Sequence, residues 1–480
     1  MPLLPRILGA VTLSLLISSV PTRTTASWES MSGSALSGVL IAGTSAPVAA
    51  SLIIEAGLSK SALSVQLPAV LHMSRSWQAQ SWQARTMTAS APPRSPLFSV
   101  PLSVQLGVAA LEDVLQGGQV RRETVRRRYA LSLTPAQLAR LRAGGSLTSV
   151  HSISVQQELE AVYQQIEARK PRDARFVSLG ADDLADQKSW VARGQSGWTV
   201  NRAVTAQRLL LALRSSSPKI QVAVRLTPPE RTVQSLRAAG VLRHIASGTS
   251  SYAGSPSFRV HNIRVGSARL SGWLLGAGEV FDFNRALGRV SAARGFVPGY
   301  VILGDRLSLE DGGGVCQVST TLFRAAYTAG LEMVERHAHS HQVSYYDPPG
   351  FEATVYAPSL NFRFRNDTGR ALLIQAAWDV KAQTLRFDLF GAIRHDVTVS
   401  APRISGLRPA RPPSFMSDAA LKPGQVVRVD MPASGMQVLI ERQIRDEGGK
   451  VRRDVTRSSY RPWGGVFTVH PSDPRLLLKD

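Results

Sequence analysis

Apolar residues between positions 97 and 250 follow helical and strand-like spacings in turn. Thr134, Pro135 and Gly144 are typical of a short helix with an N-cap, a proline in its first turn and a closing glycine. A second helix, ended by Pro171, is predicted by apolar residues at i, i+4, i+7 and i+11, namely Val155, Leu159, Val162 and Ile166. These patterns predict a mixed α+β domain over 97–250.

Two further patterns complete this prediction of the fold. A third helix is predicted over 202–213. After it, apolar residues alternate with a period of two, which predicts one half-buried strand containing Ile220, Val222, Val224 and Leu226. Beyond residue 397 the segments 426–429 and 436–440 alternate, and 447–450 is typical of a hairpin turn. We therefore expect a small β-rich appendix over 397–480 with a supporting role, and an α+β fold for the whole protein.

The amino terminus has the layout of a secretory signal. Arg6 precedes an uncharged apolar run, 7–20, which is followed by Pro21 and small residues. We expect 1–27 to be a signal peptide or membrane leader and 28–96, with its repeated Ser-Trp-Gln-Ala, to be a low-complexity linker. The predicted location is the cell envelope outside the cytoplasmic membrane, which the protein contacts only through this leader.

The charge balance indicates anionic partners. The chain has 56 Lys and Arg against 34 Asp and Glu, a net charge of +22, which attracts polyanions of any kind. It has no zinc-finger spacing, basic leucine-zipper pattern or aromatic RNA-binding motif, so we expect no nucleic-acid partner. One arginine cluster is either a binding site for an anionic ligand or a solvated charged face: Arg121, Arg122, Arg126, Arg127 and Arg128. The oligomeric state stays open.

The most distinctive stretch is the glycine-rich segment 311–324, which contains the only cysteine of the chain, Cys316. Its three glycines allow positive φ and close backbone approach. Apolar residues then share one helical face until Gly330: Val318, Leu322, Ala325, Ala326 and Ala329. Cys316 is therefore predicted in the first turn of a buried helix, where backbone N–H groups and the helix dipole lower a thiol pKa and stabilise an oxyanion.

Histidines and a carboxylate follow this helix. His337, His339 and His341 alternate as on one face of a strand, and Glu352 opens another predicted strand, 353–356. Papain-like and transglutaminase-like thiol enzymes have the same layout, with a cysteine at a helix start, a histidine on a strand and a carboxylate on the next strand. The candidate roles are Cys316 as nucleophile, His339 ahead of His337 as base, and Glu352 as orienting group.

Two other roles for Cys316 stay open. Free cysteine is commonly a small buried residue, and a tight glycine turn would suit it. Cys316 with two of the three histidines would also suffice for a zinc site. We expect no cofactor and no metal.

Four motifs together resemble the VanW family: the segments 279–284, 312–322, 335–340 and 361–366. The resemblance implies a VanW domain over 260–396 and a cell-wall context, without a defined reaction. Asp282, Glu352 and Asn361 stand where the family usually has Ser, Asp and Asp. The region 97–250 resembles the peptidoglycan-binding domain that often precedes VanW domains.

Two functions follow from this resemblance and the candidate residues. The first is a Cys-His hydrolase or transpeptidase of wall peptides, and the second is a non-catalytic wall-binding accessory associated with glycopeptide resistance or envelope maintenance. The expected partner is peptidoglycan or another anionic wall polymer. The expected ligand-binding residues are Gly312, Gly313, Gly314, Gln317, Ser319, Thr320 and Arg336.

Overall fold

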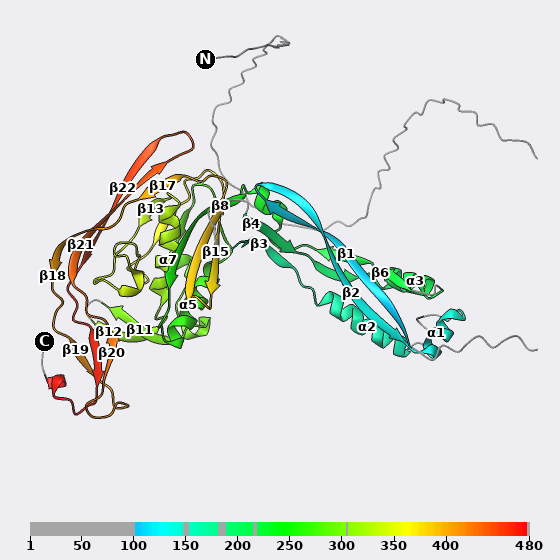
Figure 1. Ribbon diagram of the computed structural model, residues 1–480, viewed down its shortest axis with the longest axis horizontal. Helices are drawn as coiled ribbons and strands as arrows, with labels where there is room; N and C mark the ends of the chain where they lie inside the picture. Colours follow the sequence, from blue (N-terminus) through cyan, green and yellow to red (C-terminus); the bar gives the residue numbers. More distant parts are fainter. Residues whose placement is uncertain are drawn as a thin grey trace, which may run out of the picture. The chain divides into compact units, whose positions relative to one another are not determined.

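A computed structural model describes residues 101–145, 147, 153–180, 189–214, 218–303 and 306–477 (Figure 1). The expected leader (1–27) and linker (28–96) lie outside the described residues. No helix in the described part is long and apolar enough to cross a membrane. The α+β fold class is confirmed, since helices and strands are mixed along the described chain.

The first region is built on a long antiparallel hairpin, β1 (Leu102–Gln116) and β2 (Gln119–Leu133). The sheet order is β2-β1-β4-β3, with β6 beside β1. Its other strands are β3 (Arg172–Ser178), β4 (Trp190–Gln195) and β6 (Lys219–Gln221). Its helices are α1 (Pro135–Arg142), α2 (Ile153–Glu167) and α3 (Arg202–Ala212).

The three predicted helices are confirmed. Thr134 caps α1 through a hydrogen bond from the amide of Gln137. The four apolar residues that predicted α2 are all buried in one core. The single strand predicted over 220–226 is wrong, because β6 ends at Gln221 and β7 (Val224–Thr227) pairs with β5 (Gly197–Val200) in another sheet.

The central region places helices on a four-stranded sheet with the order β8-β16-β15-β9. These strands are β8 (Arg243–Ser251), β16 (Thr384–Gly391), β15 (Leu372–Asp379) and β9 (Trp273–Leu275). Its helices are α5 (Ser257–Leu270), α6 (Phe283–Leu287) and α7 (Val315–Thr328). Helix α4 (Val233–Ala238) packs instead against β1 and β4 of the first sheet. Gly248 lets α7 lie directly on β8, because a Cβ there would be 2.3 Å from the carbonyl oxygen of Thr321.

Short strands and turns surround this core. β10 (Val280–Asp282), β14 (Arg363–Arg365) and β13 (Glu332–Glu335) form one sheet, and β11 (Pro298–Leu303) and β12 (Arg306–Asp311) form another. The 3₁₀ turns are Ala292–Arg294, Ser344–Tyr346 and Pro474–Leu477.

In the described carboxy-terminal part, the regular elements are strands, apart from the last 3₁₀ turn. One sheet contains β17 (Asp396–Val399), β18 (Arg403–Arg408), β21 (Gly435–Arg445) and β22 (Val451–Tyr460). The other contains β19 (Ser414–Ser417), β20 (Val426–Asp430) and β23 (Val466–Val469). The predicted turn at 447–450 joins β21 to β22, as expected.

One hydrophobic core extends from Ile245 to Tyr460. It combines α5, α7 and the central sheet with Met436, Val438 and Ile440 of β21. The division into parts at 97–250, 260–396 and 397–480 stays a prediction. The central core nevertheless contains residues that this division assigns to its neighbours.

Candidate active site

Cys316 is the second residue of α7, as the glycine motif predicts. Gly314 is the N-cap with φ 111°, and Gly312 has φ 95°, so both use conformations that favour glycine. The apolar face predicted for this helix is buried, with Val318 and Leu322 fully inaccessible. Because that face packs into the core, the rotation of α7 about its own axis is fixed. Cys316 therefore has a fixed direction at the amino-terminal end of the helix.

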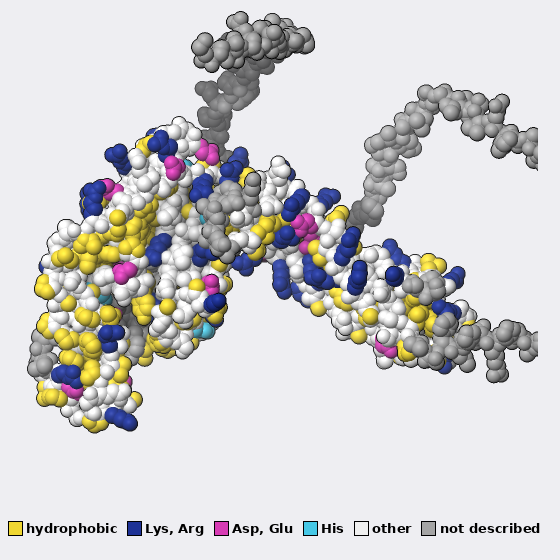
Figure 2. Space-filling view, viewed as in Figure 1, with side chains coloured by type: hydrophobic (Ala, Val, Ile, Leu, Met, Phe, Trp, Pro, Cys, Tyr) yellow, Lys and Arg dark blue, Asp and Glu magenta, His cyan; other side chains and the backbone are white. Residues whose placement is uncertain are grey.

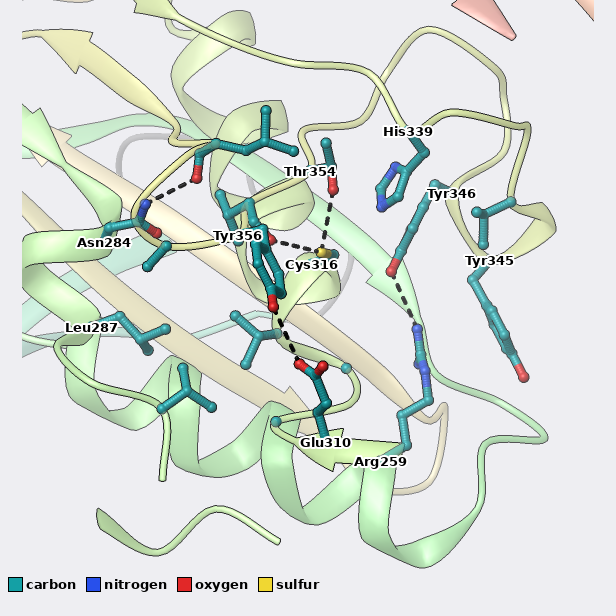
Figure 3. Close-up of a pocket in the computed structure, with 18 of the residues that line it drawn as sticks. Arg259, Asn284, Leu287, Glu310, Cys316, His339, Tyr345, Tyr346, Thr354 and Tyr356 are labelled. Atoms are coloured by element: carbon teal, nitrogen blue, oxygen red, sulfur yellow. Dashed lines mark hydrogen bonds between the residues drawn. The ribbon is translucent and has the colours of Figure 1, made fainter. Parts of the chain in front are cut away.

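The thiol of Cys316 is half-buried and lies against the segment 354–355 (Figure 3). Its sulfur is 3.5 Å from Oγ1 of Thr354 and 3.5 Å from the carbonyl oxygen of Val355. The ring of His339 faces the same space. Thiol and imidazole interact directly, and each affects the ionisation of the other.

His339 is paired with Glu352. Its Nδ1 lies 2.7 Å from Oε2 of Glu352, and its backbone N–H donates to Oε1 at 3.3 Å. The side chains of the pair are only 8% and 2% exposed, and the imidazole also stacks on Tyr346 with 4.9 Å between ring centroids. Since the carboxylate engages Nδ1, the nitrogen left for the thiol is Nε2.

The ionisation of the three groups is coupled. Burial alone would lower the pKa of His339, but the charge of Glu352 and hydrogen bonds to Cys316 and Glu352 raise it to about 10. Burial would raise the pKa of Cys316, but the hydrogen bond and positive charge of His339 lower it overall. Burial likewise opposes ionisation of Glu352, whose pKa is nevertheless lowered by His339, Tyr460 and Arg336. The mutual interactions therefore favour the charged forms of all three groups, which are thiolate, imidazolium and carboxylate.

Arginines hold the loops that contain this triad. Arg336 donates to the carbonyl of Glu352 at 2.6 Å, to Gly350 at 3.0 Å and to the hydroxyl of Ser458 in β22 at 2.8 Å. Arg324 of α7 is half-buried and donates to the carbonyls of Phe351 and Tyr346 at 2.8 and 2.6 Å. The helix that contains the thiol is thereby tied to the loops that contain its partners.

The carboxy-terminal strands reach the same loops. The Tyr460 hydroxyl accepts a hydrogen bond from the Gly350 amide at 2.9 Å and also hydrogen-bonds to Glu352. The amide of Arg461 donates to the carbonyl of Ser340 at 2.7 Å, one residue after His339. The end of β22 and the residue after it therefore support both the base and its orienting carboxylate from outside the central region.

A cavity of about 600 Å³ opens beside the thiol. Cys316 and His339 line it together with aromatic and aliphatic side chains such as Tyr345, Tyr356 and Leu287 (Figure 3). Its charged lining residues are Arg259, Arg289, Glu310 and Asp430. A mostly apolar cavity with few polar groups beside a nucleophile is the usual form of an enzyme site for an organic substrate.

The predicted ligand-binding residues divide into two groups. Gly312 and Gly314 line the cavity, where a ligand role stays a prediction. The remaining five do not line it: Gly313, Gln317, Ser319, Thr320 and Arg336. Gln317 is fully buried and bonded to Ser250 and Arg259, and the hydroxyls of Ser319 and Thr320 bond to the backbone of Ala353. These side chains position the segment next to Cys316.

The three histidines do not share one strand face. β13 ends at Glu335, and His337 makes one isolated bridge to Thr354, so the strand predicted over 337–341 is absent. The ring of His337 bonds to Glu335 at 3.0 Å, and that of His341 stacks on Trp463 at 4.4 Å. The strand predicted over 353–356 is likewise reduced to isolated bridges.

Only His339 therefore reaches the thiol. No group of three His, Cys, Asp or Glu side chains in the described part of the chain is arranged to hold a metal ion.

Several site residues escaped the sequence reasoning. Tyr346, which stacks on His339, follows it closely, but Arg259, Asp430 and Tyr460 are distant in sequence. Arg259 donates to the Gln317 side chain at 2.6 Å and to the Tyr346 hydroxyl at 3.4 Å. Only a tyrosine beside the histidine block was a usable signal, because contacts between distant segments leave no pattern in a single sequence.

Comparisons with known proteins agree with the motifs. Residues 258–390 match the family model described as VanW like protein. The chain is 33% identical over 153 residues to the uncharacterized protein YoaR of Bacillus subtilis (strain 168). This matched stretch covers 31% of this chain and 50% of that relative. It is 28% identical over 116 residues to the vancomycin B-type resistance protein VanW of Enterococcus faecalis (strain ATCC 700802 / V583), 23% of this chain and 42% of that relative. The chain thus spans half or less of the length of these relatives. The resemblance of 97–250 to a peptidoglycan-binding domain stays a prediction.

Proposed function

The chain carries a VanW domain over residues 258–390, and from that premise we propose that it is a thiol hydrolase or transpeptidase of cell-wall peptides. Cys316 is the nucleophile, His339 the general base and acid, and Glu352 the group that orients the imidazole. The observation that carries the proposal is the continuous contact from Glu352 through His339 to a thiol on a cavity wall.

The reaction proceeds in two steps. The Cys316 thiolate attacks the carbonyl carbon of a peptide amide, and a sulfur–carbon bond forms. The carbon–nitrogen bond then breaks, and the proton on Nε2 of His339 passes to the leaving amine. Water in hydrolysis, or an acceptor amine in transpeptidation, gives its proton to His339 and attacks the thioester, which releases Cys316 and the product.

The start of α7 supports the charged states of this reaction. The amides of Val315 and Gln317 donate to the carbonyls of Gly312 and Gly314 at 2.9 and 3.0 Å, so the support comes from the dipole, which adds partial positive charge at the helix start. Cys316 is the second residue of the helix, so the oxygen of an attacked carbonyl would lie near this positive end. A fixed dipole of this kind stabilises the oxyanion of the tetrahedral intermediate.

The cellular setting belongs to the same proposal. The apolar segment 7–20 after Arg6 supports export, and the E. faecalis relative is named for vancomycin resistance. We place the folded protein outside the cytoplasmic membrane, with peptidoglycan or another anionic wall polymer as partner. No cofactor is needed for a thiol acyl transfer of this kind.

A digestion assay tests the proposal. Purified peptidoglycan is incubated with the wild-type protein, with Cys316→Ala and with Glu335→Gln, a control that removes a carboxylate bonded to the non-triad His337. The proposal expects new amine termini, detected by mass spectrometry, from wild type and Glu335→Gln and none from Cys316→Ala. Wall binding by all three proteins without any cleaved bond would instead support the non-catalytic accessory.

A further inference from the structure

The hairpin of β1 and β2 contains an unusual surplus of arginine. Its three acidic residues all contact arginines: Glu112 pairs with Arg169 at 2.7 Å, Asp113 with Arg122 at 3.6 Å, and Glu123 with Arg121 at 3.0 Å and Arg193 at 2.6 Å. No acidic partner is left within the described residues for Arg126, Arg127 and Arg128.

The alternation of β2 decides where these side chains point. Val125, Tyr129 and Leu131 pack into the core, so Arg126 and Arg128 point to the opposite, solvent-facing side of the sheet. Arg127 lies on the same side of β2 as Val125 and Tyr129, where it is exposed and donates to the carbonyl of Arg126 at 3.5 Å. β2 is the edge strand of its sheet, so one long side of this row is open.

The neighbouring strand leaves the guanidinium groups uncovered. Arg126 lies opposite Ala109 and Arg128 opposite Gly107, whose side chains are too small to cover them. Lys219 of β6 is exposed one strand further, next to Gln105 of β1. Figure 2 shows Lys and Arg side chains gathered over β1 and β2. We name Arg126, Arg128 and Lys219 the basic sheet face.

We propose that the basic sheet face binds a linear phosphodiester polymer that lacks bases, of the kind that decorates cell walls. Side chains two apart on a strand are about 7 Å apart along it, so the row offers repeated charge along one direction. Guanidinium groups match phosphate oxygens with two parallel hydrogen bonds. A flat, open row suits a long chain better than a small ligand, which would need an enclosing pocket.

The composition of this face disfavours nucleic acid. Proteins that bind single strands place aromatic side chains where bases can stack. The outward residues of the hairpin include no aromatic side chain: Ser103, Gln105, Gly107, Ala109, Leu111 and Asp113 of β1, and Arg122, Thr124, Arg126, Arg128, Ala130 and Ser132 of β2. This inference goes beyond the thiol site and does not depend on it.

Binding of purified poly(glycerol phosphate) to the full chain tests this inference. The variant Arg126→Gln/Arg128→Gln/Lys219→Gln is compared with Arg445→Gln/Arg453→Gln/Arg457→Gln, which removes the same charge from exposed positions on β21 and β22. We expect the first variant to weaken binding about tenfold or more near 0.1 M salt and to reduce the slope of log K against log salt by about 2 to 3. The control variant should keep wild-type affinity to within about twofold, and so should Cys316→Ala, which separates this result from the proposed function.

Several results would overturn the proposal. Equal losses in the two triple variants would mean that only net charge matters. Tighter binding of oligothymidylate, or of vesicles containing phosphatidylglycerol, than of poly(glycerol phosphate) would assign the face to another partner. Unchanged polymer affinity with new self-association of the first variant would mean that the arginines only protect an open sheet edge. Circular dichroism of each variant confirms that it is folded before binding is measured.

Discussion

Gly314 shows how a single residue position determines where the thiol lies. A Cβ at Gly314 would lie 3.0 Å from Cγ and 3.1 Å from the carbonyl oxygen of Arg259, in addition to the strain of φ 111°. Gly424 also has positive φ, 81°, but nothing lies within 4 Å of its Cβ position.

We therefore expect Gly314→Ala to lower the free energy of unfolding by about 2 to 4 kcal/mol, the combined cost of backbone strain and a crowded contact. Gly424→Ala should cost about 1 to 2 kcal/mol, the strain alone. Urea titrations of both variants give the comparison. Equal losses would show that contact with Arg259 is unimportant.

Glu352 and His339 make a second prediction about individual residues. The pKa of His339 is about 10 because Glu352 opposes the effect of burial, so neutralising that carboxylate should lower it. In Glu352→Gln we expect nuclear magnetic resonance titration to place the His339 pKa well below 10. The variant Glu335→Gln, whose carboxylate contacts His337, serves as the control and should leave His339 unchanged. A His339 pKa that stays near 10 in Glu352→Gln would remove Glu352 from the orienting role.

The triad was predictable at the level of residue identity but not of local structure. Spacing and resemblance point to Cys316, His339 and Glu352, and the structure brings them together. The strand spacing that placed three histidines together was misleading, because β13 ends at Glu335 and tertiary packing shapes the loop beyond it. Local periodicity describes repeating backbone, whereas this segment is held by side chains from Arg336 and Tyr460.

Helices were easier to predict than strands. α1, α2, α3 and α7 follow from caps and from apolar residues on one face, both of which are local features. The segment 220–226 also alternates, yet it contains two strands that pair with different partners. Strand pairing depends on remote segments, so alternation alone does not reveal where one strand ends.

β22 gives a prediction about an element outside the VanW match. Tyr460 is fully buried, and its hydroxyl contacts both the Gly350 amide and Glu352, so Tyr460→Phe leaves the buried amide without a partner and removes one hydrogen bond from the carboxylate. We expect a loss of about 1 to 3 kcal/mol in unfolding free energy. Tyr327→Phe is the matched control, because the buried Tyr327 hydroxyl contacts Thr456 at 3.4 Å, a weak bond far less costly to lose. Equal stability of Tyr460→Phe and wild type would argue against this support.

At the scale of the molecule, the carboxy-terminal strands belong to the folding unit of the site. Arg442 of β21 is 2% exposed and donates to the carbonyls of Tyr327 and Leu331 at the end of α7, at 2.7 and 2.6 Å. Arg452 of β22 donates to the carbonyl of Gly330 at 2.7 Å. These side chains therefore tie the end of α7 and the turn that follows it to the carboxy-terminal strands.

Removal of residues 397–480 should therefore prevent stable folding of the VanW domain. The truncated protein loses the arginine contacts with α7 and the core residues Met436, Val438, Ile440 and Tyr460. We expect it to lack the cooperative thermal transition of the full chain in calorimetry. A truncated protein that melts cooperatively near the wild-type temperature would instead show that residues 397–480 fold separately from the VanW domain.

The most direct test of the central claim is the pH dependence of Cys316 alkylation by iodoacetamide. Since the pKa of the thiol is lowered by His339, the wild-type rate should reach its midpoint below about 8.5, the ordinary value for cysteine. In His339→Asn the positive charge is lost while burial remains, so the midpoint should rise above about 8.5. His337→Asn should match wild type. A wild-type midpoint at or above 8.5 that His339→Asn leaves unchanged would contradict an activated thiol at this site.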